Sequence, residues 1–320
     1  MKCLIIGYGS IGERYANILV DLGVNVYIYD LKKKTVLTKI NVIKDLHTIK
    51  QNFFNLIIIC TPSQDHFQTF QTIKEKSLNI LIEKPISNQI HESEMILAEK
   101  KKLRSNIFVV SNMRFHPGIE FLRKKIKYIG NIHNVYSHFG SKLPEKRIQK
   151  KNSYIYNSHS RGGGITIDLI HEFDYLAYLF GKIKIFSGLS ENLTINNLKF
   201  ENRSSYLLKS NENFPIFLHL NFFQELKTRG CKILGSNGIL EWQSYRKNPE
   251  YISLSFYHIK KKIEKKMIRA SLDVSYIEML KSILRFVKTG KVDERLSDVQ
   301  QGLEALILAK KNFKNSKKIR

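Results

Sequence analysis

Hydrophobic and polar residues alternate in blocks along the first 110 positions of the chain. Short apolar runs, which are typical of buried strands, are each followed by a segment whose apolar residues recur at helical spacing. Strands are predicted in 2–9, 25–30, 54–63, 79–87 and 106–115, and helices in 10–23, 66–77 and 91–104. Because this β-α-β alternation requires crossover connections, it predicts a doubly wound parallel sheet with helices on both faces.

The pattern changes after "FHPG" at 115–118. The following segments are predicted as a helix (119–128), a strand (131–140), a polar loop (141–161), a further helix, a run of strands (183–258) and two closing helices (274–288 and 297–313). Many short strands after mixed structure are typical of an α+β domain with a large, mostly antiparallel sheet. The sequence therefore predicts two domains, 1–117 and 118–320.

Composition supports a globular protein that works inside the cell. Hydrophobic residues make up 42% of the 320 positions, enough for a real core. The apolar runs fall short of the ~18 residues that span a bilayer, and glycines interrupt the start "MKCLIIGYGSIG" too early for a signal peptide. The three cysteines are scattered and odd in number, which favours reduced thiols. We expect a soluble cytoplasmic protein with no metal site and no membrane partner.

The net charge of +25 raises the question of a polyanionic partner. The basic runs are spread along a chain that is rich in Lys, Asn and Ile throughout, so a general compositional bias explains them better than one binding face. A basic helix or an aromatic platform does not accompany the lysines, and no nucleic-acid partner is expected. A basic surface would also attract a phosphorylated small-molecule substrate.

The segment "GYGSIG" at 7–12 has the spacing G-x-G-x-x-G between a predicted strand and a predicted helix. In a dinucleotide-binding turn, Gly7 would permit the tight bend, Gly9 would let the backbone approach a pyrophosphate, and Gly12 would let the helix pack against the strand. The N–H groups of Ser10 and Ile11, at the helix start, would face the phosphates. This context predicts a Rossmann domain that binds NAD(P).

The acidic residue Asp30 ends the second predicted strand, 18 residues after Gly12. A carboxylate at this position accepts hydrogen bonds from the adenosine ribose and repels a 2′-phosphate, so NAD is favoured over NADP. Three lysines at 32–34 follow directly and would soften this preference. NADP therefore stays possible as the cofactor.

An ionisable cluster lies within an apolar segment, "GGGITIDLIHEFDYLAYLFG" at 162–181. If a helix starts after Gly164, spacing of 100° per residue gives it one polar stripe and an apolar opposite face. The stripe contains Asp168, His171, Glu172 and Tyr175, with Asp174 beside it. Three carboxylates and a histidine are unusual on the solvent face of so basic a chain. We therefore expect the stripe to lie outside the core and to face a cofactor cleft.

The stripe supplies candidates for acid–base chemistry. His171 can take a substrate proton because an unperturbed histidine titrates near neutrality. Asp168 can bind a substrate hydroxyl or orient His171, and Glu172 is a second candidate base. Further substrate-side candidates are Arg114 and His116 in "NMRFHPG" and Tyr154, Tyr156 and Arg161 in the loop before the glycines; of these, Arg114 fits the wall of the site better than the chemistry.

The ordered motifs resemble the glucose-fructose oxidoreductase/inositol dehydrogenase (Gfo/Idh/MocA) family over nearly the whole chain. The resemblance rests on "GYGSIG", "CTPSQDH" (60–66), "EKPIS" (83–87), "NMRFHP" (112–117), "GGGITIDLIHEFD" (162–174), "GSNGILEW" (235–242) and "SYIEML" (275–280). It implies a Rossmann domain, a substrate domain whose sheet often forms a dimer or tetramer interface, and hydride transfer between NAD(P) and a hydroxyl-bearing carbon of a sugar or polyol.

The resemblance also implies roles for individual residues. Lys84 of the E-K-P segment matches the family's catalytic lysine, and the Lys84–Pro85 bond is expected to be cis. Thr61 and Pro62 match the loop along the nicotinamide. His66 and Glu83, from the same two segments, complete the expected cofactor-binding set. Elementary chemistry agrees on Lys84, because alcohol oxidation needs a proton acceptor and a cation near the developing alkoxide at the carboxyl edge of the sheet.

One departure concerns the base. The usual family spacing is D-x-x-x-H, whereas His171 comes three residues after Asp168 and Glu172 takes the fourth position. Residues three and four positions after Asp168 lie on the same helix face, so either His171 or Glu172 can act as the base. His171 is favoured. "HEFDY" resembles a branch with H-E-x-D-Y, which suggests a nucleotide sugar and surface-polysaccharide synthesis. The predicted function is an NAD(P)-dependent sugar, polyol or nucleotide-sugar oxidoreductase; the alternative is a non-catalytic NAD(H) sensor.

Overall fold

The computed structural model describes residues 1–31, 39–142, 163–193, 200–244, 248 and 250–311. Contacts divide the chain into two compact units. The first unit joins Met1–Ser111 with Tyr276–Leu306, and the second joins Asn112–Ser275 with the residues from Ile307 onward. The segment 276–306 thus groups with the first unit, and residues 112–117 group with the second, whereas the sequence prediction divided the chain at 117/118.

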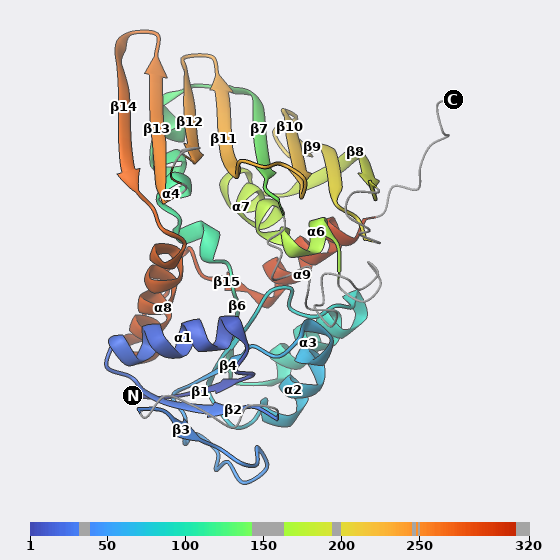
Figure 1. Cartoon of the computed structure of the whole chain (residues 1–320), viewed down its shortest axis with the longest axis vertical. Coiled ribbons are helices and arrows are strands. Elements are labelled where there is room, and N and C mark those ends of the chain that lie inside the picture. Colours follow the sequence, from blue (N-terminus) through green and yellow to red (C-terminus); the bar gives the residue numbers. More distant parts are fainter. Residues whose placement is uncertain (32–38, 143–162, 194–199, 245–247, 249, 312–320) are drawn as a thin grey trace. The chain divides into compact units, whose positions relative to one another are not determined.

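The first unit contains a seven-stranded sheet in the order β15-β6-β5-β4-β1-β2-β3 (Figure 1). Its strands are β1 (Lys2–Ile6), β2 (Asn25–Tyr29), β3 (Asn41–Val42), β4 (Leu56–Ile59), β5 (Asn79–Ile82), β6 (Asn106–Val109) and β15 (Ser297–Asp298). All neighbours pair in parallel except β15, which runs antiparallel to β6. This arrangement confirms the predicted Rossmann-like sheet.

Helices complete the first unit. They are α1 (Ser10–Asp21), α2 (His66–Ile73), α3 (Ile90–Lys102) and most of α8 (Leu272–Thr289) and α9 (Val299–Lys310). Strand β4 reads "LIII" with every side chain buried, as expected for a strand covered on both faces. The rings of Tyr15 on α1 and Tyr276 on α8 meet edge to face, with their centroids 5.7 Å apart. Helix α9 packs closely against strand β6, because a Cβ built on Gly302 of α9 would lie 2.8 Å from the side chain of Val109.

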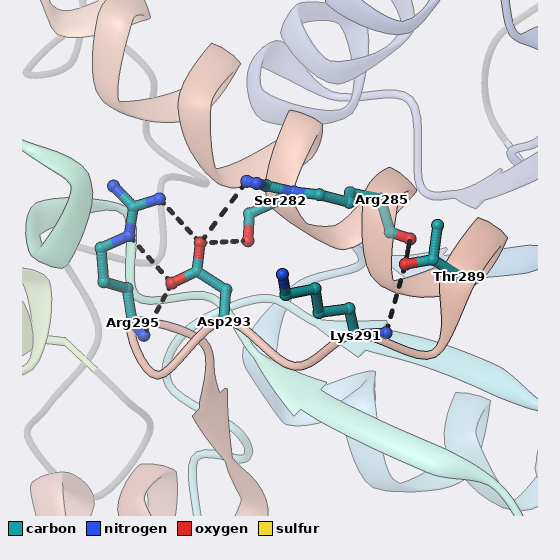
Figure 2. A network of polar contacts seen from close by, with 6 residues as sticks. All are labelled: Ser282, Arg285, Thr289, Lys291, Asp293 and Arg295. Carbon is teal, nitrogen blue, oxygen red and sulfur yellow. Dashed lines mark hydrogen bonds and ion pairs between the residues drawn. The ribbon is translucent and has the colours of Figure 1, made fainter.

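A polar network holds the connection between α8 and β15 (Figure 2). Arg295 donates to both carboxylate oxygens of Asp293, from Nε at 2.9 Å and from Nη2 at 2.7 Å. The hydroxyl of Ser282 adds a hydrogen bond at 2.8 Å, and Arg285 lies 3.8 Å away. Burial raises the pKa of Asp293, but the hydrogen bonds from Arg295 and Ser282 outweigh it and hold the pKa below its ordinary value.

Replacing Asp293 with asparagine should therefore destabilise the protein by about 1–3 kcal/mol at neutral pH. A carboxyl whose folded-state pKa is depressed stabilises the fold above its unfolded pKa of about 3.9 and loses this contribution as the pH falls. The difference between wild type and Asp293→Asn should accordingly shrink below about pH 4. Urea unfolding at several pH values measures this, and a pH-independent difference would contradict the assignment.

The second unit contains an eight-stranded sheet in the order β14-β13-β12-β11-β7-β10-β9-β8 (Figure 1). Its strands are β7 (Ile132–Gly140), β8 (Ile183–Glu191), β9 (Arg203–Ser210), β10 (Pro215–Asn221), β11 (Thr228–Gly235), β12 (Gly238–Ser244), β13 (Tyr251–His258) and β14 (Lys261–Arg269). Among the described strands of this second sheet, only β7 and β10 pair in parallel, which confirms a large, mostly antiparallel sheet.

Helices cover one face of this sheet. They are α4 (Pro117–Lys125), α6 (Ile165–Asp168) and α7 (Ile170–Phe180). The 3₁₀ turns at Asn112–Phe115 and Ile126–Tyr128 belong to this unit, and the one at Ser63–Asp65 belongs to the first. The strand register places Tyr206, Leu218, Ser137, Cys231 and Trp242 in one row across the sheet, all of them buried. The adjacent row points to the other face, where Tyr136 and Phe217 stack at 5.1 Å and are 44% and 40% exposed.

None of the helices within the described residues is long and apolar enough to cross a membrane. The same part of the chain holds no group of three histidine, cysteine or acidic side chains placed to bind a metal ion.

Candidate active site

The glycine turn between β1 and α1 has the tight packing that its spacing predicts. Gly7 has φ of +93°, and a Cβ there would lie 2.7 Å from the backbone of Cys60 and Thr61. A Cβ on Gly12 would lie 2.0 Å from the carbonyl oxygen of Gly7. Because backbone atoms cannot move aside, larger residues are excluded at both positions. The end of β1, the start of α1 and the end of β4 are thereby held together.

Gly9 differs from its two neighbours in the motif. It is exposed, it is the N-cap of α1, and a Cβ built on it meets no atom of the described residues within 4 Å. Ser10 beside it is also exposed, and Ile11 is half-buried. The open space over Gly9 therefore lies at a helix N-terminus, where N–H groups and the helix dipole favour a phosphate. These residues fit the pyrophosphate of a dinucleotide.

Asp30 lies directly after β2, against the glycine turn. Its Oδ2 accepts a hydrogen bond from the N–H of Tyr8 at 2.6 Å, and the N–H of Gly7 donates to the carbonyl of Tyr29 at 2.8 Å. The half-buried carboxylate is thus fixed beside the motif, where the sequence placed a ribose ligand. The lysines at 32–34 lie outside the described residues.

The loops after β4 and β5 follow the ends of adjacent parallel strands. Thr61 and Pro62 follow β4, and Glu83, Lys84 and Pro85 follow β5. Pro62 is exposed and Lys84 is half-buried. The Lys84–Pro85 peptide bond is cis, as the family resemblance implied. Both loops lie at the carboxyl edge of the sheet, where α/β folds bind ligands.

Glu83 and His66, which the sequence assigned to cofactor binding, direct their side chains at protein atoms. Glu83 is 6% exposed; it accepts hydrogen bonds from the Tyr15 hydroxyl at 2.5 Å and from the Lys84 N–H at 2.8 Å. Burial raises the pKa of Glu83, although the nearby Lys84 opposes this. His66 is 1% exposed and contacts the carbonyl groups of Thr61 and Pro85.

The helix expected after Gly164 begins there, but the prediction of one continuous helix is wrong. The helix breaks at Leu169, with φ of −100° and ψ of 28°, so Asp168 ends α6 and His171 lies in the first turn of α7. Asp168 and His171 are half-buried. Helical spacing therefore does not relate these two residues, although both keep part of their surface exposed.

The expectation that the whole polar stripe lies outside the core is also wrong. Glu172 and Tyr175 are 0% exposed and Asp174 is 7% exposed. Glu172 forms an ion pair with Arg229 of β11, with Nη2 and Oε1 2.5 Å apart. The Ser137 hydroxyl of β7 lies 3.5 Å from the other oxygen of Glu172. Burial of the carboxylate is possible because a cation and a hydroxyl from the sheet meet it.

Asp174 has its own cation, supplied by Arg114. Arg114 donates to both carboxylate oxygens, from Nη2 at 2.6 Å and from Nε at 3.1 Å, and it is 2% exposed. This two-point contact fixes α7 to the 3₁₀ turn at Asn112–Phe115. The guanidinium of Arg114 is thus engaged by a carboxylate of the protein itself. Tyr154, Tyr156 and Arg161, the other substrate-side candidates, lie outside the described residues.

His116, a further candidate, caps a helix. Its Nδ1 accepts a hydrogen bond from the N–H of Gly118 at 3.1 Å, and its ring lies 4.7 Å from that of Trp242. Burial, together with the charges of Arg229 and Lys227, lowers the pKa of His116 to about 3 and keeps the ring neutral. Sequence reasoning missed Arg229 altogether; the available signal was two acidic residues in an apolar segment, each of which needs a buried cation.

The fold and the glycine turn fit a dinucleotide-binding domain, and the family comparisons identify the class as an oxidoreductase with an NAD-binding Rossmann fold. Residues 1–111 match the model described as "Oxidoreductase family, NAD-binding Rossmann fold", and residues 123–241 match the "GFO/IDH/MocA C-terminal domain". Together the two models match more than half of the chain. The chain belongs to the Gfo/Idh/MocA oxidoreductase family.

Individual relatives are distant. The uncharacterized oxidoreductase YrbE of Bacillus subtilis is 31% identical over 127 residues, which cover 39% of this chain and 35% of YrbE. The WlbA dehydrogenase of Chromobacterium violaceum, solved in complex with NADH and UDP-GlcNAcA, is 16% identical with a TM-score of 0.79, covering 96% of this chain and 90% of WlbA. A myo-inositol dehydrogenase of Corynebacterium glutamicum is 17% identical with a TM-score of 0.76, covering 97% and 94%. These two structural likenesses show the fold.

Proposed function

We propose that this protein transfers hydride between NAD and a hydroxyl-bearing carbon of a sugar, polyol or nucleotide sugar. The observation that carries the proposal is the turn at Gly9, where no described side chain caps α1, flanked by Asp30 and followed along the same sheet edge by the Lys84 loop. NAD, when bound, supplies the hydride acceptor or donor. The residues of the chain then have to hold the substrate and move its proton.

The proposed roles follow from chemistry and exposure. Lys84 stabilises the alkoxide that develops on the substrate oxygen, and His171 accepts the hydroxyl proton. Asp168 binds a neighbouring hydroxyl or orients His171. The choice of His171 over Glu172 as the base is supported by burial: Glu172 is 0% exposed and paired with Arg229, whereas His171 is half-buried.

The cofactor preference is proposed from Asp30. A carboxylate fixed beside the glycine turn would accept hydrogen bonds from the ribose hydroxyls of NAD and repel the 2′-phosphate of NADP. The three described cysteines are free and buried, which fits the cytoplasmic location expected for an enzyme that draws on the cellular NAD pool.

A nucleotide sugar is the substrate we favour. WlbA, whose fold this chain shares, binds UDP-GlcNAcA, and the net charge of +25 suits a phosphorylated substrate. A pathway of surface-polysaccharide synthesis would follow from such a substrate. The myo-inositol dehydrogenase among the structural neighbours keeps polyols as the next class to try.

Turnover tests this function. Purified protein is mixed with NAD and a panel of UDP-sugars, free sugars and inositols, and absorbance at 340 nm reports NADH. Formation of NADH with one substrate class supports the proposal. Tight NADH binding without turnover on any member, in either direction of the reaction, would instead favour the NAD(H) sensor.

We also propose that copies of the chain associate through the face of the second sheet opposite α4, α6 and α7. The exposed Tyr136–Phe217 stack supports this, because contiguous exposed aromatic surface is costly in water. Tyr136→Glu with Phe217→Glu should convert a dimer or tetramer to a monomer in light scattering. Val292→Glu, at an exposed position of the first unit, should not. A wild-type protein that is monomeric at micromolar concentration would contradict this.

A further inference from the structure

His66 contacts two loops of the first unit at once. It is the first residue of α2 and is 1% exposed. Its Nε2 lies 2.8 Å from the carbonyl oxygen of Thr61, in the loop after β4, and its Nδ1 lies 3.0 Å from that of Pro85, in the loop after β5. One further hydrogen bond joins the two loops directly, from the N–H of Asn88 to the carbonyl of Ser63 at 3.2 Å.

The chemistry of the ring suits this bridging position. Carbonyl oxygens only accept hydrogen bonds, so a neutral imidazole donates to one of them and a protonated imidazole donates to both. Burial lowers the pKa of His66, while hydrogen bonds to the backbone of Thr61 and Pro85 oppose that effect. In either state the ring fills the space between the two loops, but only the protonated ring donates a hydrogen bond to each of them.

The loop after β5 also contacts α1, through Glu83 at the start of the loop. The hydroxyl of Tyr15, on the helix that follows the glycine turn, donates to Glu83 at 2.5 Å, and the same carboxylate accepts from the N–H of Lys84 at 2.8 Å. Both sequence neighbours of Lys84 therefore have hydrogen-bond partners that restrict their position. The side chain of Glu83 is bonded to Tyr15, and the carbonyl group of Pro85 contacts His66.

We propose that His66 is a positioning residue, which sets the spacing between the Thr61–Pro62 loop and the Lys84–Pro85 loop, so that both loops fit the nicotinamide and the Lys84 ammonium lies beside it for the substrate oxygen. The inference rests on the proposed function, in which both loops border the nicotinamide. His66 itself is buried and acts only through the backbone of the two loops. His66, which the sequence analysis placed among the cofactor-binding residues, thus supports the cofactor site without contacting the cofactor.

The test compares side chains that keep or lose the bridge. His66→Phe keeps a ring of similar size without donors, His66→Asn is too short to reach both carbonyls, and His66→Gln keeps an N–H₂ donor at comparable reach. Phe70→Leu, one turn along α2 at another fully buried position, is the matched control for stability alone. Each variant is assayed for thermal unfolding, for NADH affinity by calorimetry, and for acetylation of Lys84 by mass spectrometry with and without NADH.

In the wild type, NADH should protect Lys84 from acetylation. His66→Phe and His66→Asn should weaken NADH binding about tenfold and remove most of the protection, whereas His66→Gln should restore both toward the wild type. Phe70→Leu should lower the unfolding temperature and leave affinity and protection unchanged.

The outcomes separate this inference from the proposed function. If NADH does not protect Lys84 in the wild type, the assignment of Lys84 fails and the inference fails with it. If the wild type is protected and folded His66→Phe or His66→Asn binds NADH and protects Lys84 equally well, only the inference is overturned. Should His66→Phe fail to fold, His66→Asn and His66→Gln decide the question by the same two measurements.

Discussion

Lys84→Met is expected to lower turnover by at least about 100-fold, with NADH affinity changed by no more than about threefold. Methionine keeps the length of the side chain and removes the charge that would stabilise the developing alkoxide. The loop itself should stay in place, because Glu83 and Pro85 are held by their own partners. The measurement is a steady-state rate on the substrate found in the turnover screen, together with calorimetric titration of NADH.

A second lysine provides the control for this variant. Lys101 is exposed in the last turn of α3, in the same unit, and Lys101→Met should leave both turnover and binding unchanged. If Lys84→Met retained most of its turnover, the ammonium would have no part in the chemistry, and the role assigned to the E-K-P segment would have to be withdrawn.

Asp174→Leu is expected to destabilise the second unit by about 3–5 kcal/mol, because it leaves the guanidinium of Arg114 buried without its carboxylate. The double variant Asp174→Leu with Arg114→Met should recover most of that loss, since replacing a whole buried ion pair by apolar side chains is often neutral. Urea unfolding of both variants measures the two effects.

An exposed pair gives the comparison. Glu278 and Lys281 on α8 are 3.0 Å apart with side chains about half exposed, and Glu278→Ala should change stability by less than about 1 kcal/mol. Equal effects of Asp174→Leu and Glu278→Ala would contradict the view that the Arg114–Asp174 pair anchors α7. So would a double variant that is no more stable than Asp174→Leu.

Much of the fold could be predicted from the sequence because buried parallel strands leave a clear signal. A run such as "LIII" in β4 has no polar residue and admits few interpretations. Strand β14, "KKIEKKMIR", was missed because charged residues occupy both of its faces at the edge of the sheet. The two-residue strands β3 and β15 were missed because so short a segment carries no periodicity.

The candidate site was predictable where backbone geometry dictates the residue type. Gly7 and Gly12 are required by contacts with main-chain atoms, and their spacing identifies the turn. The burial of Glu172 and Asp174 in ion pairs was not predictable from the helix pattern. Their partners, Arg229 and Arg114, lie far away in the sequence, and a helical projection contains no information about a cation supplied by a strand or a distant turn.

Calorimetric titration with NADH and with NADPH, preceded by an absorption spectrum of the protein as purified, tests the central claim most directly. We expect micromolar or tighter binding of NADH, weaker binding of NADPH, and loss of that preference in Asp30→Ala. A nicotinamide already bound after purification would agree with this. A folded protein that binds neither nucleotide would contradict the assignment of the glycine turn, and with it the proposal that this chain is an NAD-dependent oxidoreductase.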